Sequence, residues 1–279
     1  MLRASMCRRG AGQMRADADE AVRRLAAENL AAAAGRLAQG IACVLGGEFE
    51  EGDALLAGVI NTGEAAAAPD TLATALCQRS LLAIARGGWS RAEALAGQAE
   101  AAMRRAGLED ALACAVQARV ALHRGDVVSA RQQLNSAQRA RPSLTYAQPY
   151  FAVQARIELA RVHLALGDLG GARTLMGEVD ELLSRRPGLG TLVDEAKALR
   201  GQLSKRRGHI VPGASSLTAA ELRVLPLLAT HLQHSEIAAE LFLSPLTIKT
   251  HNKSIYRKLD ASSRGQAVAR ARELGLLEG

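Results

Sequence analysis

Residues 244–259 read Ser-Pro-Leu-Thr-Ile-Lys-Thr-His-Asn-Lys-Ser-Ile-Tyr-Arg-Lys-Leu, a stretch that predicts one amphipathic helix. Ser244 stands where an N-cap residue belongs, and Pro245 follows at the first helical position, where its missing N–H is harmless. Four apolar residues are expected to face a core: Leu246, Ile248, Ile255 and Leu259. The opposite face carries, at three- and four-residue spacing, Lys249, Thr250, Lys253 and Arg257. This cationic face predicts a helix that lies in a DNA major groove.

The segments on either side predict three more helices. Thr218 and Glu221 form a capping box, which opens an apolar run of Leu222, Leu225, Leu228 and Ala229. Ser235 is expected to cap a short second helix, residues 236–243, with Ile237, Ala238 and Leu241 inward. A last helix is expected over residues 264–274, with an apolar stripe of Val268, Ala269 and Leu274 and with Gly275 ending it.

Together these segments, residues 217–277, resemble the LuxR-type helix-turn-helix domain. The matching stretches are Leu217-Thr218 with Glu221, Val224-Leu225, Glu236-Ile237-Ala238, Leu243-Ser244, Thr247-Ile248-Lys249 with His251, Ile255-Tyr256-Arg257-Lys258-Leu259, Ser263-Arg264, Ala267-Val268 and Glu273-Leu274-Gly275-Leu276-Leu277. The version found here is similar to regulators of high-GC actinobacteria. The resemblance covers about the last quarter of the chain and implies a four-helix DNA-binding domain.

The resemblance also implies roles for individual positions. Residues expected to face base edges are Lys249, Thr250 and Lys253, and those expected near phosphates are Ser244, Thr247, His251 and Arg257. The last helix is expected to supply a dimer contact around Ser263, Gln266, Ala267 and Arg270. For His251 a place in the core is an equal alternative, and Tyr256 is expected to be a packing residue.

Two residues depart from the pattern of the LuxR-type domain. Pro226 falls inside the first helix, where proline removes a hydrogen bond and is expected to kink the helix. His231 stands where many members have a glycine that ends this helix. Neither residue lies on the predicted DNA face, so they affect the expected geometry of the first helix and its end more than the predicted DNA binding.

Composition indicates an all-α chain of two domains. Of the 279 residues, 48% are apolar and only 3% are aromatic, so the core must consist of Ala and Leu packed helix on helix. Runs of β-branched residues with a period of two are absent. The net charge of +7 fits a polyanionic partner without proving one.

The four cysteines, Cys7, Cys43, Cys77 and Cys114, have no metal-ligand spacing such as C-x-x-C. We expect Cys43, Cys77 and Cys114 to be small buried residues in the repeated helices, and all the thiols to be reduced in a cytoplasmic protein, with neither a metal nor a cofactor. The N-terminal arginines lack the continuous apolar run of a signal peptide, and no stretch of about 20 apolar residues predicts a membrane span.

The first 200 residues contain a repeat. Four glycines begin a shared turn pattern (Gly47, Gly87, Gly125 and Gly167), and a small residue follows five positions later (Gly52, Ala92, Ala130 and Ala172). Glycine supplies a left-handed turn that ends one helix, and the small residue lets the next helix pack closely. Such hairpins stack because none can bury its apolar face alone. The pattern resembles a tetratricopeptide solenoid and the helical-repeat region of large maltose-regulator-like LuxR proteins.

Other residues of the repeat region have packing roles in this interpretation. Trp89 is expected to pack within its hairpin, and Ser90 with Glu93 to form a capping box. His123 and His163 occupy different phases of the repeat, so they predict no shared site. A final helix is expected over residues 191–206. We expect a repeat domain over 1–207, a linker over 208–216 and the helix-turn-helix domain over 217–279.

The function predicted from these features is sequence-specific DNA binding by a dimeric transcriptional regulator, with an effector or partner at the repeats and RNA polymerase as a further candidate partner. An enzyme is not expected, because P-loop, G-x-S-x-G and H-E-x-x-H motifs are absent. One alternative is a helical-repeat interaction scaffold whose C-terminal module does not read DNA. Another is a sigma-factor-like promoter reader, which the last helix and the repeats disfavour.

Overall fold

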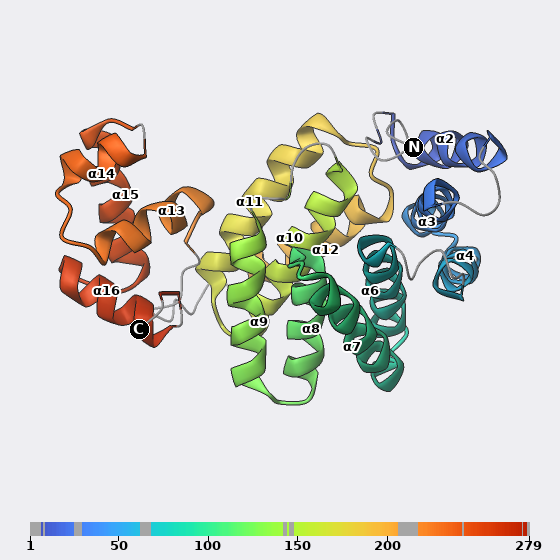
Figure 1. The fold of residues 1–279 in the computed structure, drawn as a ribbon, viewed down its shortest axis with the longest axis horizontal. Coiled ribbons are helices and arrows are strands. Elements are labelled where there is room, and N and C mark those ends of the chain that lie inside the picture. The colour runs from blue at the N-terminus through green and yellow to red at the C-terminus, as the bar shows by residue number, and fades with distance from the viewer. Residues whose placement is uncertain are drawn as a thin grey trace. The chain divides into compact units, whose positions relative to one another are not determined.

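The computed structural model describes residues 7, 9–24, 30–61, 68–141, 144, 148–205, 217–241, 243–274 and 276–277. Within these ranges every regular element is a helix, which confirms the all-α prediction (Figure 1). The helices of the repeat region are α2 (Ala11–Arg24), α3 (Leu30–Gly46), α4 (Phe49–Asn61), α6 (Pro69–Ala85), α7 (Trp89–Ala106), α8 (Ala111–His123), α9 (Val127–Ala140), α10 (Pro149–Ala165), α11 (Leu169–Arg185) and α12 (Thr191–Lys205). They are followed by α13 (Ala219–Leu228), α14 (His234–Glu240), α15 (Pro245–Lys258) and α16 (Arg264–Glu273).

The chain divides into two compact units. One consists of Met1–Val162 with Leu175–Gln202, and the other of His163–Thr174 with Leu203–Gly279. The predicted linker, 208–216, and residue 206, the predicted end of the last repeat helix, lie outside the described residues. In the part of the chain that is described, no helix is long and apolar enough to cross a membrane.

Glycine turns join the helices of the repeat region into hairpins, compatible with the predicted solenoid. Gly47, Gly87, Gly125 and Gly167 have φ angles of 86°, 75°, 77° and 82°, the left-handed conformation that glycine adopts without a steric penalty. α3 packs on α4, α6 on α7, and α8 on α9. The sequence prediction of these turns is therefore confirmed.

Small residues at the start of each second helix allow this close packing. A Cβ atom added to Gly52 would lie 2.7 Å from a methyl of Val44, so only glycine fits there. Ala92, Ala130 and Ala172 are fully buried at the equivalent positions. Replacing these small residues with larger ones would force the paired helices apart.

Within the first unit, the turn before α12 reaches back to the beginning of the chain. Thr191 Oγ1 donates to the carbonyl of Val44 at 3.3 Å, and Ala11 N donates to the carbonyl of Gly188 at 2.9 Å. Gln78 of α6 and Gln154 of α10, two hairpins apart, are buried and exchange hydrogen bonds of 2.5 and 3.1 Å. The helices of this unit thus enclose polar as well as apolar side chains.

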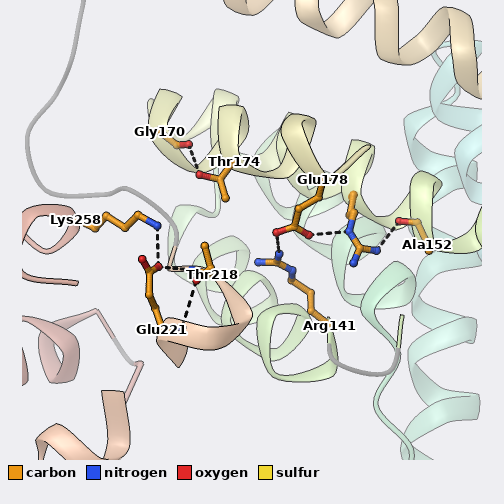
Figure 2. A network of polar contacts seen from close by, with 9 residues as sticks. Arg141, Ala152, Gly170, Thr174, Glu178, Thr218, Glu221 and Lys258 are labelled. Atoms are coloured by element: carbon orange, nitrogen blue, oxygen red, sulfur yellow. Dashed lines mark hydrogen bonds and ion pairs between the residues drawn. The ribbon is translucent and has the colours of Figure 1, made fainter. Parts of the chain in front are cut away.

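Ion pairs connect helices of the first unit to one another. Arg119 of α8 donates to buried Glu158 of α10 at 2.5 Å. Glu178 of α11 accepts a hydrogen bond of 2.6 Å from Arg141 (Figure 2). Arg156 of α10 donates to the same carboxylate at 2.8 Å. The pKa of Glu178 is lowered, because the two arginines outweigh the effect of burial. In each of these ion pairs the arginine offsets the charge of the carboxylate at a place where the packed helices exclude water.

Side chains at the hairpin turns have structural partners. Trp89 stacks on His123, with ring centroids 3.9 Å apart, and packs beside Ile84, which confirms its packing role. His163 Nδ1 lies 2.8 Å from a carboxylate oxygen of Asp168. The capping box predicted for Ser90 is wrong, because Gly88 is the N-cap of α7 and makes no side-chain cap.

The four cysteines are free. Cys7, Cys43 and Cys77 are buried, and Cys114 is half-buried. Burial raises the pKa of the Cys114 thiol to about 12, so the thiol stays protonated near neutral pH. The predicted role as small buried residues is therefore confirmed for Cys43 and Cys77, whereas Cys114 is only half-buried.

Helices α13 to α16 surround one apolar core. Its buried members are Leu217, Val224, Leu225, Leu228, Ile237, Ala238, Ile248, Ile255, Leu259, Ala267 and Ala271. α15 packs against both α13 and α14. Pro226 lies exposed inside α13, so its ring points away from this core.

Four details of these helices differ from the sequence prediction. Leu246 is 73% exposed and not part of the core, because it lies about 200° around the helix from Ile248 at about 100° per residue. α14 begins at His234, not after Ser235, because Glu236 accepts from the backbone N–H of Gln233 at 2.6 Å. It ends at Glu240, three residues before the expected end. Ala269 is exposed, and Gly275 lies outside the described residues.

Candidate nucleic-acid interface

The N-terminal end of α15 is fixed by two hydroxyl groups. Ser244 Oγ accepts a hydrogen bond from Thr247 N at 3.1 Å, as an N-cap does, and lies 2.8 Å from Thr247 Oγ1. Pro245 occupies the first helical position. The predicted start of this helix is therefore confirmed, and its first turn is held in one orientation.

α15 presents two distinct faces. Ile248, Asn252, Ile255 and Leu259 are buried against the other helices of the domain. The residues exposed on the other side are Leu246, Lys249, Thr250, Lys253 and Arg257. At about 100° per residue, Leu246, Thr250, Lys253 and Arg257 fall within about 60° of one another around the helix axis. The domain thus holds this stripe toward solvent while the opposite stripe anchors it.

The cations of α15 divide into two kinds. Lys249, Lys253 and Arg257 are exposed and form no ion pair within the described ranges. Lys258 is largely buried, with 12% of its side chain exposed, and its Nζ lies 2.7 Å from Glu221 Oε2. Three cations are therefore available to an anionic partner, and Lys258 stabilises the fold.

Glu221 connects α13 to α15 (Figure 2). Its carboxylate accepts from the backbone N–H of Thr218 at 2.6 Å, and Thr218 Oγ1 accepts from Glu221 N, which confirms the predicted capping box. Burial would raise the pKa of Glu221. The ammonium of Lys258, the Thr218 N–H and the Ser254 hydroxyl together outweigh burial and lower it. Glu221 is therefore ionised near neutral pH, and its ion pair with Lys258 holds α15 in position against α13.

The structure places the remaining predicted contact residues near the ends and flanks of the exposed stripe. Ser244 is exposed at the beginning of α15, and Thr247 and His251 are half-buried on its flank. Tyr256 is half-buried and packs against the core of the domain, as expected of a packing residue. Because His251 is half-buried, the structure favours neither of its two alternatives, a place in the core or a contact with phosphate.

The residues expected at a dimer contact are spread along α16, from its N-cap Ser263 to Arg270 in its last turn. Ser263 Oγ accepts from Gln266 N at 3.3 Å, and Gln266 Oε1 accepts from Ser262 N at 2.9 Å. Arg270 pairs with Glu273 at 2.6 Å on the exposed side. Ala267 is fully buried in the domain's own core, so its side chain is not available to a second subunit.

Arg264 is a structural residue that the sequence reasoning did not single out. Its guanidinium group donates to the carbonyls of Leu228 at 2.9 Å, Leu232 at 2.6 Å, Leu227 at 3.1 Å and Thr230 at 2.8 Å. These carbonyls belong to the end of α13 and the turn after it, where a helix leaves its last acceptors without partners. Arg264 thereby caps the end of α13 at the turn that contains His231.

Asn252 is a second residue that the sequence reasoning did not single out. It lies in the buried stripe of α15, and only 3% of its surface is exposed. Neither Nδ2 nor Oδ1 of its amide has a hydrogen-bond partner among the residues that the structure describes. A buried polar group without a partner keeps the cost of losing its water. Its position between Ile248 and Ile255, at core spacing, was the available signal.

Replacing Asn252 with valine is expected to stabilise the domain by about 1–3 kcal/mol, the cost of an unsatisfied buried polar group. Hydrogen–deuterium exchange of peptides from α13 and α15 in the full chain measures this as slower exchange. Asn252→Asp is the control, and it is expected to destabilise the domain because it places a charge at the same buried position. Faster exchange in Asn252→Val would mean that the amide has a favourable role.

One group in the first unit has the composition of a metal site. Ligand atoms of Cys43, Glu48 and Glu51 lie within 4.8 Å of one another. Arg15 pairs with Glu48 and also donates to Glu51 at 2.7 Å. A guanidinium group between both carboxylates already compensates their charge, so the arrangement is that of an ion-pair cluster.

Residues 215–271 match the family described as "Bacterial regulatory proteins, luxR family". Over 80 residues the chain is 39% identical to the "Probable transcriptional regulatory protein NarL" of Mycobacterium tuberculosis, covering 29% of this chain and 36% of that protein. It is 46% identical over 79 residues to the "Transcriptional regulatory protein LiaR" of Bacillus subtilis, covering 28% and 37%. It is 47% identical over 58 residues to the "Nitrate/nitrite response regulator protein homolog" of Haemophilus influenzae, covering 21% and 28%.

The matched part of the chain thus covers at most 37% of the length of these three relatives. The family match falls on α13 to α16, the same helices whose core, caps and exposed stripe are described above. The C-terminal domain of this chain belongs to the luxR family of bacterial regulatory proteins.

Proposed function

We propose that the protein is a transcriptional regulator that binds DNA in the cytoplasm through the exposed face of α15. The observation that carries the proposal is the separation of cations in this helix. Lys249, Lys253 and Arg257 are exposed and outside any ion pair in the described parts of the chain, while Lys258 is used inside the domain. Lysine and arginine at helical spacing suit guanine O6 and N7 in the major groove and the phosphates beside it.

In this proposal Lys249, Thr250 and Lys253 face base edges, and Ser244, Thr247, His251 and Arg257 lie toward the phosphates. Ser244 and Thr247 share one hydrogen bond between their hydroxyls, so one hydroxyl proton remains to donate to a phosphate oxygen. The positive end of the α15 dipole lies at the same place. The first turn of α15 therefore combines two features that favour an anion, a free hydroxyl proton and the positive end of the helix dipole.

The proposal includes a dimer on DNA, through the exposed residues Ser263, Gln266 and Arg270 of α16. Two-fold symmetry would place the two copies of α15 in successive major grooves, with half-sites about one helical turn apart. Ala267 would act indirectly, by holding α16 against the core. The proposal also includes an effector or protein partner at the repeat helices and contact with RNA polymerase. Its support for a regulatory role is that the relatives are named as transcriptional regulatory proteins.

Selection from a random DNA pool with the full-length protein tests the proposal. We expect an inverted repeat from the wild type and no enrichment with Lys249→Ala/Lys253→Ala. Arg223→Ala is the matched control, because Arg223 is an exposed cation of the same domain on α13, and it should enrich the same sequences. Failure of the wild type to enrich any sequence would contradict DNA reading and favour an interaction scaffold.

Affinity for the selected site is expected to fall steeply with salt. Each phosphate neutralised by lysine or arginine releases counterions, so a dimer with 6–10 such contacts loses about 10³–10⁵ in affinity between about 50 and 200 mM salt. Titrations by fluorescence anisotropy at several salt concentrations measure the slope. Arg257→Ala should reduce the slope by roughly one contact in each subunit, and a flat dependence in the wild type would contradict phosphate-driven binding.

A further inference from the structure

Leu246 is unusually exposed for a large apolar residue. It is 73% exposed, more than the other large apolar residues of the described chain, and Leu243, three residues earlier, is 40% exposed. Single apolar residues are common on protein surfaces and need no explanation by themselves. The position of Leu246 within the cationic stripe of α15 is what distinguishes it.

Leu246 lies in the middle of that stripe. At about 100° per residue it falls about 20° from both Lys253 and Arg257 around the helix axis, on the side opposite the buried stripe. It occupies the first turn of α15, the end of a recognition helix that commonly enters the major groove. Leu246 therefore faces the same side as Lys253, about two helical turns nearer the beginning of α15.

Thr250 extends the apolar character of this position. Its Oγ1 donates to the carbonyl of Leu246 at 3.0 Å, so the one hydroxyl proton is used inside the helix. Thr250 can then offer DNA its methyl group and an acceptor, but no donor. Leu246 and Thr250, four residues apart, are adjacent on the helix surface. Together they form an apolar pair beside the two lysines, on one side of both around the helix axis.

The major groove presents one apolar group, the C5-methyl of thymine, while the other base edges present donors and acceptors. An apolar side chain over a donor or acceptor strips water from it without giving a hydrogen bond in return. We propose that Leu246, with the methyl group of Thr250, contacts the C5-methyl of a thymine beside the base pairs read by Lys249 and Lys253, and so determines specificity at that position. The inference rests on the proposed DNA binding.

Replacing thymine with deoxyuridine, one position at a time in each half of the selected inverted repeat, tests this contact because it removes only the methyl group. We expect one thymine per half-site at which the wild type binds the uracil-containing site about three- to fivefold more weakly, the effect of exposing one CH₂-sized group. Leu246→Ala should lose most of this preference for thymine over uracil, because only the methyl group of Thr250 remains at the contact. Because Leu246 is exposed, this variant should keep the wild-type thermal stability.

Val128→Ala is the matched control, since Val128 is an apolar residue of similar exposure, 68%, in the repeat region. It should keep the full thymine preference. Wild-type binding with no thymine-to-uracil effect would overturn this inference alone. A Leu246→Ala variant with altered affinity but an unchanged thymine preference would also overturn it and point to a protein partner at Leu246. Absence of DNA binding by the wild type would overturn the proposed function as well.

Discussion

Replacement of Arg264 with lysine is expected to destabilise the C-terminal domain by roughly 3–5 kcal/mol, although the positive charge is kept. Hydrogen bonds from charged groups contribute about 1.5–3 kcal/mol each, and Arg264 makes four with carbonyl oxygens at 2.6–3.1 Å. The planar guanidinium group reaches several acceptors at once, whereas an ammonium group is a point charge on a flexible stem. Lysine cannot reach all four carbonyls at once, although that of Leu227 would keep its hydrogen bonds from the backbone N–H and the hydroxyl of Thr230.

Hydrogen–deuterium exchange of α13 and α14 peptides in the full chain measures this loss. Arg264→Ala should show a similar or larger acceleration of exchange. Arg272→Ala is the matched control, because Arg272 lies exposed on the same helix, α16, and its removal should leave exchange unchanged. If Arg264→Lys exchanged at the wild-type rate, the network of four carbonyls would not be what holds the end of α13.

Lys258→Met is expected to cause the second large loss of stability in the C-terminal domain. Glu221 and Lys258 are 4% and 12% exposed, and removal of one partner of a buried ion pair typically costs about 3–5 kcal/mol because the other charge stays buried. The Thr218 N–H and the Ser254 hydroxyl would remain beside the carboxylate and offset part of the loss. Lys253→Met is the matched control, since Lys253 is exposed on the same helix and should tolerate the change.

The loss caused by Lys258→Met is expected to depend on pH. The pKa of Glu221 is lowered from its ordinary value of 4.5, so the stabilisation by the pair is fully present above that value. It is lost as pH falls through the lower pKa of the folded state. The wild type and Lys258→Met should therefore differ most near neutral pH and converge in acid.

A double-mutant cycle with Glu221→Gln isolates the pair, because glutamine keeps the capping box at this position. Lys258→Met should cost much less in the Glu221→Gln background than in the wild type. Equal costs in both backgrounds would show that Lys258 contributes through its aliphatic stem and not through Glu221.

The parts of the fold that sequence reasoning predicted are those determined locally. A glycine in the left-handed region ends a helix whatever surrounds it, which is why the four hairpin turns could be placed. The cap formed by Ser244 and the box formed by Thr218 and Glu221 involve residues three positions apart. The composition, rich in Ala and Leu and poor in aromatic and β-branched runs, was enough for the all-α class.

The parts that it missed have two different causes. Arg264 caps carbonyls 32 to 37 residues earlier in the chain, and no local pattern indicates such a contact. Leu246 was assigned to the core because it is apolar and lies near Ile248, whereas a rotation of about 100° per residue places it on the opposite face. Asn252 could have been found by the same rotation, which puts it in the buried stripe despite its polarity.

The most direct test of the account is a binding panel on the selected inverted repeat, with every single base-pair substitution, for the wild type and for Lys253→Ala. If α15 reads bases, the wild type should lose about 1–3 kcal/mol at each contacted position. Lys253→Ala should then lose discrimination at one position per half-site while it keeps discrimination at the others. Uniform weakening of all sites by Lys253→Ala, with every base preference intact, would contradict sequence reading by this face of the helix.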